Sequence, residues 1–339
     1  MKRNTDLTPT PVEQTDLVNM VSKVSIVLEN LALTPGNFDA CQIDEVRQVG
    51  SFKKGTMITK RNKADIVVIL KTLPIVEAIK ALGSRVLEDM FKMDPSTTNA
   101  LKVETVEVGF EITNTVKCCT ARILITTIMP NFRKIDNSIH MSVKLLQRHM
   151  SAIRHVRWFE ETANLTTIKV LIRVLRDICE RYKGLNCLTP WMIDVLAHYA
   201  VTFRKSQQLL PLNNAFKRVF QLLAAGLFLA GSTGIPDPCQ SGATTMHSPL
   251  SLIQQDSVCM TAQTLLRVLS YPDGLKVILG LEEDPLQNAG GFTDNMSVWG
   301  GIVVVPSNAA FELVQKDEHI EKKNPVTIVD EAATTKSIA

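Results

Sequence analysis

The chain has 339 residues, of which 45% are apolar and 5% aromatic, a composition that fits an aliphatic-rich globular protein and excludes a disordered one. The formal net charge of +3 at pH 7 is too small to indicate nucleic-acid binding through bulk charge. Seven cysteines without any C-x-x-C spacing argue against a disulfide framework and against a zinc site, so reduced thiols are expected.

No stretch of the sequence has the length and hydropathy of a membrane span. The longest apolar run, LLAAGLFLA at 222–230, is far shorter than the roughly 20 residues that a helix needs to cross the hydrocarbon core. The opening MKRNTDLTPTPVEQ lacks the apolar segment of a signal peptide. The sequence therefore predicts a soluble, intracellular protein that does not associate with membranes.

The first 135 residues mix helical and strand patterns. Apolar residues at helical spacing predict an amphipathic helix over 12–32, and a second helix is expected after Pro74. Strand-like patterns occur in four segments, 42–49, 64–71, 103–112 and 122–128. A lysine-rich loop joins the first two of them. This mixture predicts an α+β lobe with a mixed sheet over 1–135.

Helical periods dominate after residue 135. Helices are expected over five segments, 139–161, 165–182, 190–205, 211–229 and 254–270. The second lobe, over 136–315, is therefore predicted to be all-helical, with a short β-like return at 299–305. Residues 316–339 are polar and are expected to form a loose tail.

A phosphate site is indicated where the first predicted strand ends, at Gly50 and Ser51. Glycine lets the backbone approach phosphate oxygens, and the serine hydroxyl and neighbouring amides can donate to them. Residues 53–63 then carry five Lys and Arg side chains and no acid. A solvated basic loop explains these charges equally well. A Walker loop is excluded, because the pattern G-x-x-x-x-G-K-[ST] does not occur.

The carboxylates that metal-dependent phosphoryl transfer needs are largely missing. Two metal ions are normally held by several carboxylates on adjacent strands. Asp65 begins the strand after the basic loop, but Val67 stands where a second acid would share its face of the strand. The later strand at 121–127 contains no acid, and its charged residue is Arg122. One carboxylate where three are wanted argues against a two-metal transferase.

Several long strings of the sequence resemble the DZF-domain family. They are EVRQVGSFKKGTM, ADIVVILK, AIRHVRWFEE, KVLIRVLRDI, LTPWMIDVLAHYAV, LLAAGLFLAGSTGIPDPC and QQDSVCMTAQTLLRVLS, and the likeness extends over 1–315. The order of Gly-Ser, spacer and Asp also resembles the template-free nucleotidyltransferases, such as poly(A) polymerases and oligoadenylate synthetases. The resemblance implies a bilobal α+β fold, with a nucleotidyltransferase-like lobe followed by a helical lobe, in a nuclear pseudoenzyme lacking two of three metal-binding carboxylates.

The resemblance also implies a ligand and a partner. Nucleotide contact falls on Gly50, Ser51 and Asp65, with Lys54 as a further candidate, and no residue takes a catalytic role. The implied cofactor is a nucleoside triphosphate such as ATP with Mg²⁺, for which Asp65 would be the metal ligand. The implied partner is a second DZF protein with double-stranded-RNA-binding or zinc-finger modules. The pair acts on RNA and DNA in transcription, RNA processing and translation, in the nucleoplasm and nucleolus with shuttling to the cytoplasm.

The chain departs from the family pattern at both ends. Family members typically begin with a Gly/Arg-rich segment, which is absent before Met1, and the long acidic tail is replaced by the mixed run VQKDEHIEKKNPVTIVDEAA. The resemblance therefore implies no function for those ends in this chain.

Two other functions remain open. An active template-free transferase would use Asp65 with acids recruited from Asp136 or Asp237. A nucleic-acid-binding module is suggested by 133–183, where eleven Lys and Arg stand against five Asp and Glu, although amphipathic helices carry such charges too.

A dimerisation surface is expected on the last predicted helix. The segment 258–269 is apolar enough to bury two faces, and core packing explains it as well as a partner does. The candidate interface residues are Val258, Leu265, Leu266 and Leu269.

Overall fold

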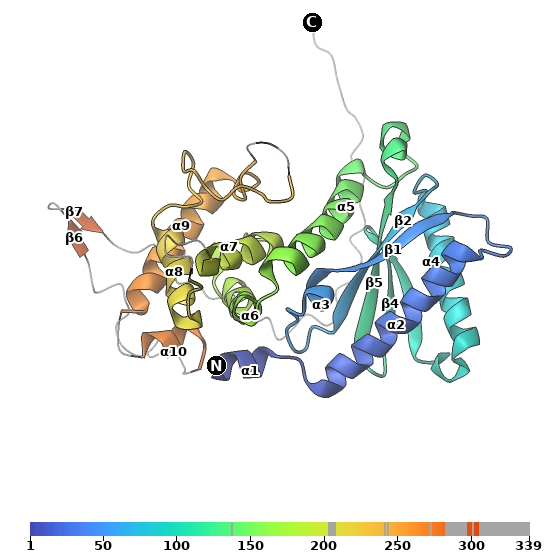
Figure 1. Cartoon of the computed structure of the whole chain (residues 1–339), viewed down its shortest axis with the longest axis horizontal. Coiled ribbons are helices and arrows are strands. Elements are labelled where there is room, and N and C mark those ends of the chain that lie inside the picture. Colours follow the sequence, from blue (N-terminus) through green and yellow to red (C-terminus); the bar gives the residue numbers. More distant parts are fainter. Residues whose placement is uncertain are drawn as a thin grey trace, which may run out of the picture.

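The computed structural model describes residues 1–136, 138–202, 208–240, 242, 244–270, 273–281, 297–299 and 302–304. They form a sheet lobe and a helical lobe (Figure 1). The predicted tail at 316–339 lies outside these residues. The predicted return at 299–305 is described in part, and belongs to an antiparallel pair of β6 (Ser297–Trp299) and β7 (Ile302–Val304). Within the described ranges, no helix combines the length and apolar character required to cross a membrane.

The sheet lobe is built on a mixed five-stranded sheet. Its strands are β1 (Ile43–Val49), β2 (Lys63–Leu70), β3 (Leu101–Val106), β4 (Gly109–Asn114) and β5 (Cys119–Thr127). They lie in the order β1-β2-β5-β4-β3, with β2 and β5 parallel and the other neighbours antiparallel. The two parallel strands begin at the same edge of the sheet, so the residues that start β2 and β5 lie side by side. The predicted α+β fold is confirmed.

The β-rich segment predicted over 103–112 contains parts of two strands, because the chain reverses within it. Val106 pairs with Gly109 across a two-residue loop that joins β3 to β4. Gly109 has φ +145°, and a Cβ at this position would stand 2.2 Å from the carbonyl oxygen of Ile123. Only glycine fits this reversal against β5. The sequence pattern is apolar on both sides of it, which conceals the turn.

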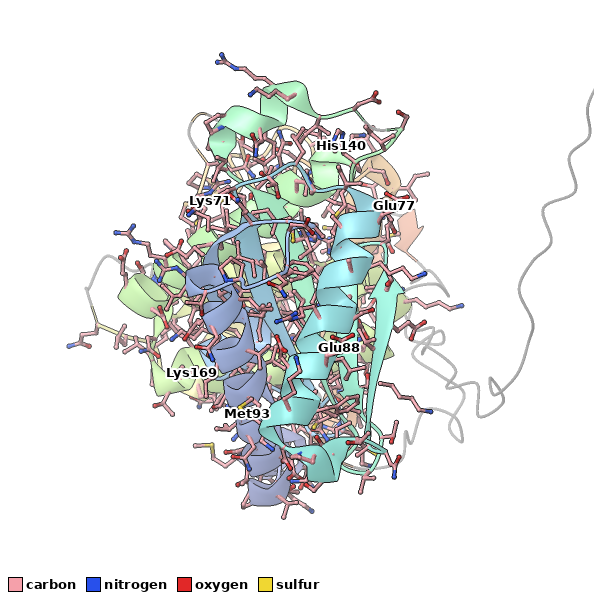
Figure 2. The ribbon with its side chains drawn as sticks, turned by 90° about the vertical axis from the view of Figure 1, so that its right-hand side faces the viewer. Lys71, Glu77, Glu88, Met93, His140 and Lys169 are labelled. Carbon is pink, nitrogen blue, oxygen red and sulfur yellow. The ribbon has the colours of Figure 1, made fainter. Side chains whose placement is uncertain are left out.

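Two helices cover one face of the sheet, α2 (Pro11–Leu33) and α4 (Val76–Met93). Thr10 and Glu13 form a capping box at the start of α2, with Pro11 at the first helical position, so the predicted helix over 12–32 is confirmed. Figure 2 shows α2 and α4 side by side, with Met93 at one end of the lobe and Lys71 and His140 at the other. Both helices bury their apolar residues against the sheet.

The other face of the sheet is covered by α3 (Gly50–Lys54) and α5 (Val143–Trp158). Val156 of α5 packs with Val67 and Leu124 in a small apolar cluster, and Leu146 is buried in the main core of the sheet lobe. From its sequence, this helix was predicted to belong to the helical lobe. Its helical period was correct, but periodicity does not reveal which neighbour a helix packs on. The packing therefore ends the sheet lobe after α5.

The helical lobe follows α5. It comprises α6 (Thr166–Arg181), α7 (Pro190–Thr202), α8 (Leu212–Ala224), α9 (Leu252–Val268) and α10 (Gly274–Ile278), which share one apolar core. The short helix α1 (Lys2–Leu7) joins this lobe from the N-terminus (Figure 1), where Arg3 forms an ion pair with Asp177 at 2.7 Å. Shorter helical turns lie at Pro95–Thr97, Met129–Lys134, Phe159–Ala163 and Lys183–Leu185.

Candidate functional site

A cavity of about 550 Å³ opens between the two lobes. From the sheet lobe, α3 and the starts of β2 and β5 line it, and from the helical lobe α6 and α7 do. All four residues predicted to contact a nucleotide lie in its wall: Gly50, Ser51, Lys54 and Asp65. The structure thus brings these four residues together, while their contact with a nucleotide stays a prediction.

Gly50 is fitted closely against Asp65. The strands β1 and β2 pair in a register that places Val49 opposite Asp65, so the chain turns into α3 directly beside the carboxylate. Gly50 has φ +71°, and a Cβ there would stand 2.5 Å from Oδ2 of Asp65. The glycine of the Gly-Ser pair is therefore required by the carboxylate as well as by the turn.

Arg122 forms an ion pair with the carboxylate of Asp65. The parallel register pairs these residues on β2 and β5, where Nε of Arg122 donates to Oδ1 of Asp65 at 2.7 Å and Nη2 lies 2.7 Å from the same oxygen in an ion pair. Burial raises the pKa of the Asp65 carboxyl, and the charge and hydrogen bond of Arg122 act against that rise. The sequence showed Arg122 in a strand without acids, but not that its guanidinium would meet Asp65.

The position that would hold a second acid lies in a small apolar cluster, with Arg47 of β1 as its cross-strand neighbour. Val67 is fully buried and lies opposite Leu124 of β5, and both pack with Val49 and Val156. In the part of the chain that the structure describes, no group of three or more His, Cys, Asp or Glu side chains could hold a metal ion. The donor set around Asp65 therefore does not fit a two-metal site.

The two recruited acids of the transferase hypothesis lie outside the cavity wall. The backbone of Asp136 contacts His140, and His140 forms an isolated β-bridge with Ile75, which follows the C-terminal end of β2. Asp65 lies near the opposite, N-terminal end of that strand. At about 3.3 Å per residue, the length of β2 separates them. Asp237 accepts hydrogen bonds from the backbone of Cys239 and the side chain of Gln240, at 2.9 and 3.0 Å. Its carboxylate also accepts from Nε1 of Trp191 on α7, at 3.4 Å, so it is already engaged by its own turn and by α7.

Lys54 forms an ion pair with Asp194, an acid that was not predicted from the sequence. Its ammonium lies 2.6 Å from Oδ2 of Asp194 on α7, and both side chains are more than nine-tenths buried. The ammonium also lies 5.4 Å over the ring of Trp191, which stacks on His155 at 3.9 Å. Burial lowers the pKa of His155 to about 3, so the stacked imidazole is neutral at physiological pH. A single acid inside the apolar helix PWMIDVLAHYAV was the available signal for Asp194.

The cavity wall carries six Lys and Arg side chains against two Asp. Four of these cations form ion pairs with carboxylates: Lys54 with Asp194, Arg61 with Glu180, Lys63 with Glu111 and Arg122 with Asp65. Lys60 and Arg176 form no such pair with a described residue. The wall and its ion-pair partners together therefore remain positive, which favours an anionic ligand.

The predicted basic face over 133–183 is divided by the fold. Arg173 donates to the carbonyl oxygens of Met57 and Gly55, and Arg181 to Asp177 and Ile278. These arginines tie α6 to its neighbours instead of facing solvent together. The positively charged side chains of this segment therefore do not all face solvent as one surface.

The predicted interface residues separate into two groups. Val258 and Leu265 are 1% and 2% exposed inside the core of the helical lobe, so as partner-facing residues they are wrong. Leu266 and Leu269 are partly buried against that core and stay candidates. Because α9 packs along α8, its inward face is occupied within the chain. The apolar residues that α9 does expose are Leu252, Ile253 and Met260.

Comparison with known proteins agrees with this architecture. The DZF N-terminal domain matches residues 1–164, and the DZF C-terminal domain matches 167–305. The fold is similar to that of CdnC from E. coli MS115-1 in a complex with HORMA-deltaN, with 14% identity over 81% of this chain and 94% of that one, and a TM-score of 0.57.

Two further solved structures share the fold. The Cid1 poly(U) polymerase with Mg 3'-dATP bound has 9% identity over 82% of this chain and 96% of that one, with a TM-score of 0.54. The cyclic AMP-GMP synthase DncV of Vibrio cholerae has 11% identity over 82% and 94%, with a TM-score of 0.51. The nucleotidyltransferase-like architecture predicted from the sequence is therefore confirmed.

Proposed function

This chain belongs to the DZF family, and from that membership and the chemistry of its cavity we propose that it is a non-catalytic nucleotide-binding subunit of a heterodimer. Its partner is a second DZF protein that carries double-stranded-RNA-binding or zinc-finger modules. RNA and DNA are bound mainly through the complex, which acts in the nucleus in transcription, RNA processing and translation. Family resemblance supports the partner, the location and these processes.

The ion pair between Arg122 and Asp65 is the observation that carries the non-catalytic part of the proposal. A metal-dependent transferase needs carboxylates that are free to bind cations. Here the one carboxylate already has a cation, and its neighbouring position is the buried Val67. The proposal requires that the purified chain incorporates no labelled nucleotide into an RNA primer in the presence of Mg²⁺ or Mn²⁺.

A nucleoside triphosphate fits the cavity better than Mg²⁺ does. The positive wall suits phosphate oxygens, and Gly50 and Ser51 provide a close backbone approach and a hydroxyl. Arg176 reaches the wall from the opposite lobe. The predicted role of Asp65 as a metal ligand receives no support from its surroundings, since Oδ1 is taken by Arg122 and Oδ2 lies against Gly50.

The exposed apolar residues of α9 support the partner proposal. Ile253 is 82% exposed and Met260 41%, and their spacing of seven residues places them on one face of the helix. Leu252 is 65% exposed beside them. Apolar side chains exposed in this way commonly mark protein–protein contacts.

Purification of the tagged chain with its bound proteins tests the subunit assignment. We expect a DZF protein with RNA-binding modules to be recovered with it, and Ile253→Asp to weaken that association by roughly tenfold or more, because a charge would be buried in an apolar contact. Val12→Asp is the matched control, since Val12 is 70% exposed on the sheet lobe. Failure to recover any DZF partner with the unchanged chain would refute the assignment.

A further inference from the structure

Arg122 stands where a nucleotidyltransferase-like cleft would hold a cation. Its guanidinium is bound to the carboxylate that begins β2, it lines the cavity, and its side chain is 34% exposed. Within the described structure, Nε donates to one oxygen of Asp65 and Nη2 forms an ion pair with the same oxygen. Guanidinium has five N–H donors, so others remain for a ligand. Arginine is always charged and matches phosphate with two parallel hydrogen bonds.

The position of Arg122 is fixed by the sheet. β5 lies between β2 and β4, and Arg122 is in register with Asp65 on one side and Glu111 on the other. Arg176 faces the same cavity from α6, where Nη1 donates to the carbonyl oxygen of Thr56 at 3.2 Å. Two half-buried arginines thus reach one cavity from opposite walls. This arrangement is preorganised for an anion with several phosphate groups.

The wall offers little to a nucleobase. The described residues that line the cavity include no aromatic side chain, and Trp191 is stacked on His155 beside it instead of entering the wall. Stacking on an aromatic ring is a main source of base affinity, at about 1–3 kcal/mol per base. Without it, the phosphates supply most of the contact and bases are poorly distinguished.

We infer that this cavity binds the polyphosphate of a nucleotide without a divalent metal ion and with little selectivity for the base, Arg122 taking the place of the metal. The inference rests on the nucleotide-binding part of the proposed function and adds its chemistry. Mg²⁺ bound to the triphosphate lowers its negative charge and competes with Arg122 for the same oxygens. Mg²⁺ therefore leaves the affinity unchanged or lowers it.

Replacing Asp65 should change the affinity for polyphosphate in opposite directions in this site and in a metal site. Asp65→Asn removes a negative charge from the cavity and releases the guanidinium of Arg122. In the absence of metal, this change strengthens polyphosphate binding by roughly threefold to tenfold, the size expected for one nearby charge at a partly exposed site. If Asp65 instead held Mg²⁺ with the nucleotide, the same substitution would weaken binding.

Calorimetric titration of the full chain tests the inference, with ATP, UTP and inorganic triphosphate as probes, each in EDTA and in Mg²⁺. We expect all three probes to bind in EDTA with affinities within about threefold of one another, and Arg122→Gln to lose roughly tenfold or more. Arg122→Lys keeps the charge without the planar fork and should bind with intermediate affinity. Arg85→Gln is the matched control, because Arg85 also pairs with an aspartate, Asp89 at 2.8 Å, but lies on α4.

Several results would overturn the inference. They are a strict requirement for Mg²⁺, unchanged binding by a folded Arg122→Gln variant, weaker binding by Asp65→Asn, and binding of ATP without binding of inorganic triphosphate. Thermal unfolding of each unliganded variant establishes that it is folded. These binding results do not measure nucleotide transfer, so the non-catalytic assignment is tested separately, by the incorporation of labelled nucleotide into an RNA primer.

Discussion

Asp194→Ala is expected to lower the free energy of unfolding by about 3–5 kcal/mol, the usual cost of removing one partner from a buried ion pair. The side chains of Lys54 and Asp194 are 9% and 4% exposed, and their contact joins α3 of one lobe to α7 of the other. Removing the carboxylate leaves the ammonium buried with only the faces of Trp191 and Phe159 nearby. Urea denaturation followed by circular dichroism measures the loss.

A double-mutant cycle separates the pair from its surroundings. Lys54→Met and Asp194→Leu should each cost about as much as Asp194→Ala, while the double variant that combines Lys54→Met with Asp194→Leu should cost less than those two single changes together, because no charge remains buried in it. Lys117→Met is the control, because Lys117 also contacts an aspartate, Asp16 at 2.7 Å, but its side chain is 48% exposed. Its loss should lower the free energy of unfolding by about 0.2–1 kcal/mol, the range typical of exposed ion pairs. A comparable small loss for Asp194→Ala would contradict the account.

Val67→Asp is expected to destabilise the protein by roughly 3 kcal/mol or more at neutral pH, and to leave it without transferase activity. The change restores the second acid that a D-x-D pair would have, but it places a carboxylate among Val49, Leu124 and Val156, whose side chains provide no hydrogen-bond donor. Its cross-strand neighbour Arg47 is already paired with Glu45. The carboxylate position has been lost together with its polar environment. Thermal and urea unfolding measure the loss of stability, and primer extension measures activity.

The pH dependence of this variant has a defined sign. Burial raises the pKa of the introduced carboxyl in the folded state above the value of about 3.9 in the unfolded chain. The part of the destabilisation that comes from the charge is therefore absent below that unfolded pKa and complete above the folded one, so the difference from the parent shrinks as pH falls. The loss of the buried valine side chain remains at every pH. Val116→Asp is the control, as Val116 is 77% exposed in the turn between β4 and β5. A stable Val67→Asp variant with metal-dependent transfer would overturn our reading of the cavity.

Periodicity was enough to predict most helices but not where they pack. The apolar spacing in α2, α4 and α6 to α9 depends on local sequence, so it can be read directly. The lobe on which α5 packs depends on contacts with β1 and β5, which are distant in sequence. The turn at Gly109 was hidden because apolar residues stand on both sides of it in the sequence. Tertiary packing decided each of these points.

The residues of the candidate site also fall into those that the local sequence predicts and those that only tertiary packing reveals. Gly50, Ser51 and Asp65 were predictable because a strand, a tight turn and a following strand place them together locally. The partners that define their chemistry, Arg122 and Asp194, come from β5 and α7, and only the sheet register and the apposition of the lobes reveal them. A single charged residue inside an apolar strand or helix was the signal for both.

Nucleotide incorporation by the purified full chain, alone and with its DZF partner, tests the central claim most directly. The assay contains an RNA primer, labelled ATP or UTP, and Mg²⁺ or Mn²⁺, with an active template-free transferase as the positive control. We predict no extension above background, and the same result for Asp65→Ala. Metal-dependent extension by the unchanged chain that Asp65→Ala abolishes would contradict the account.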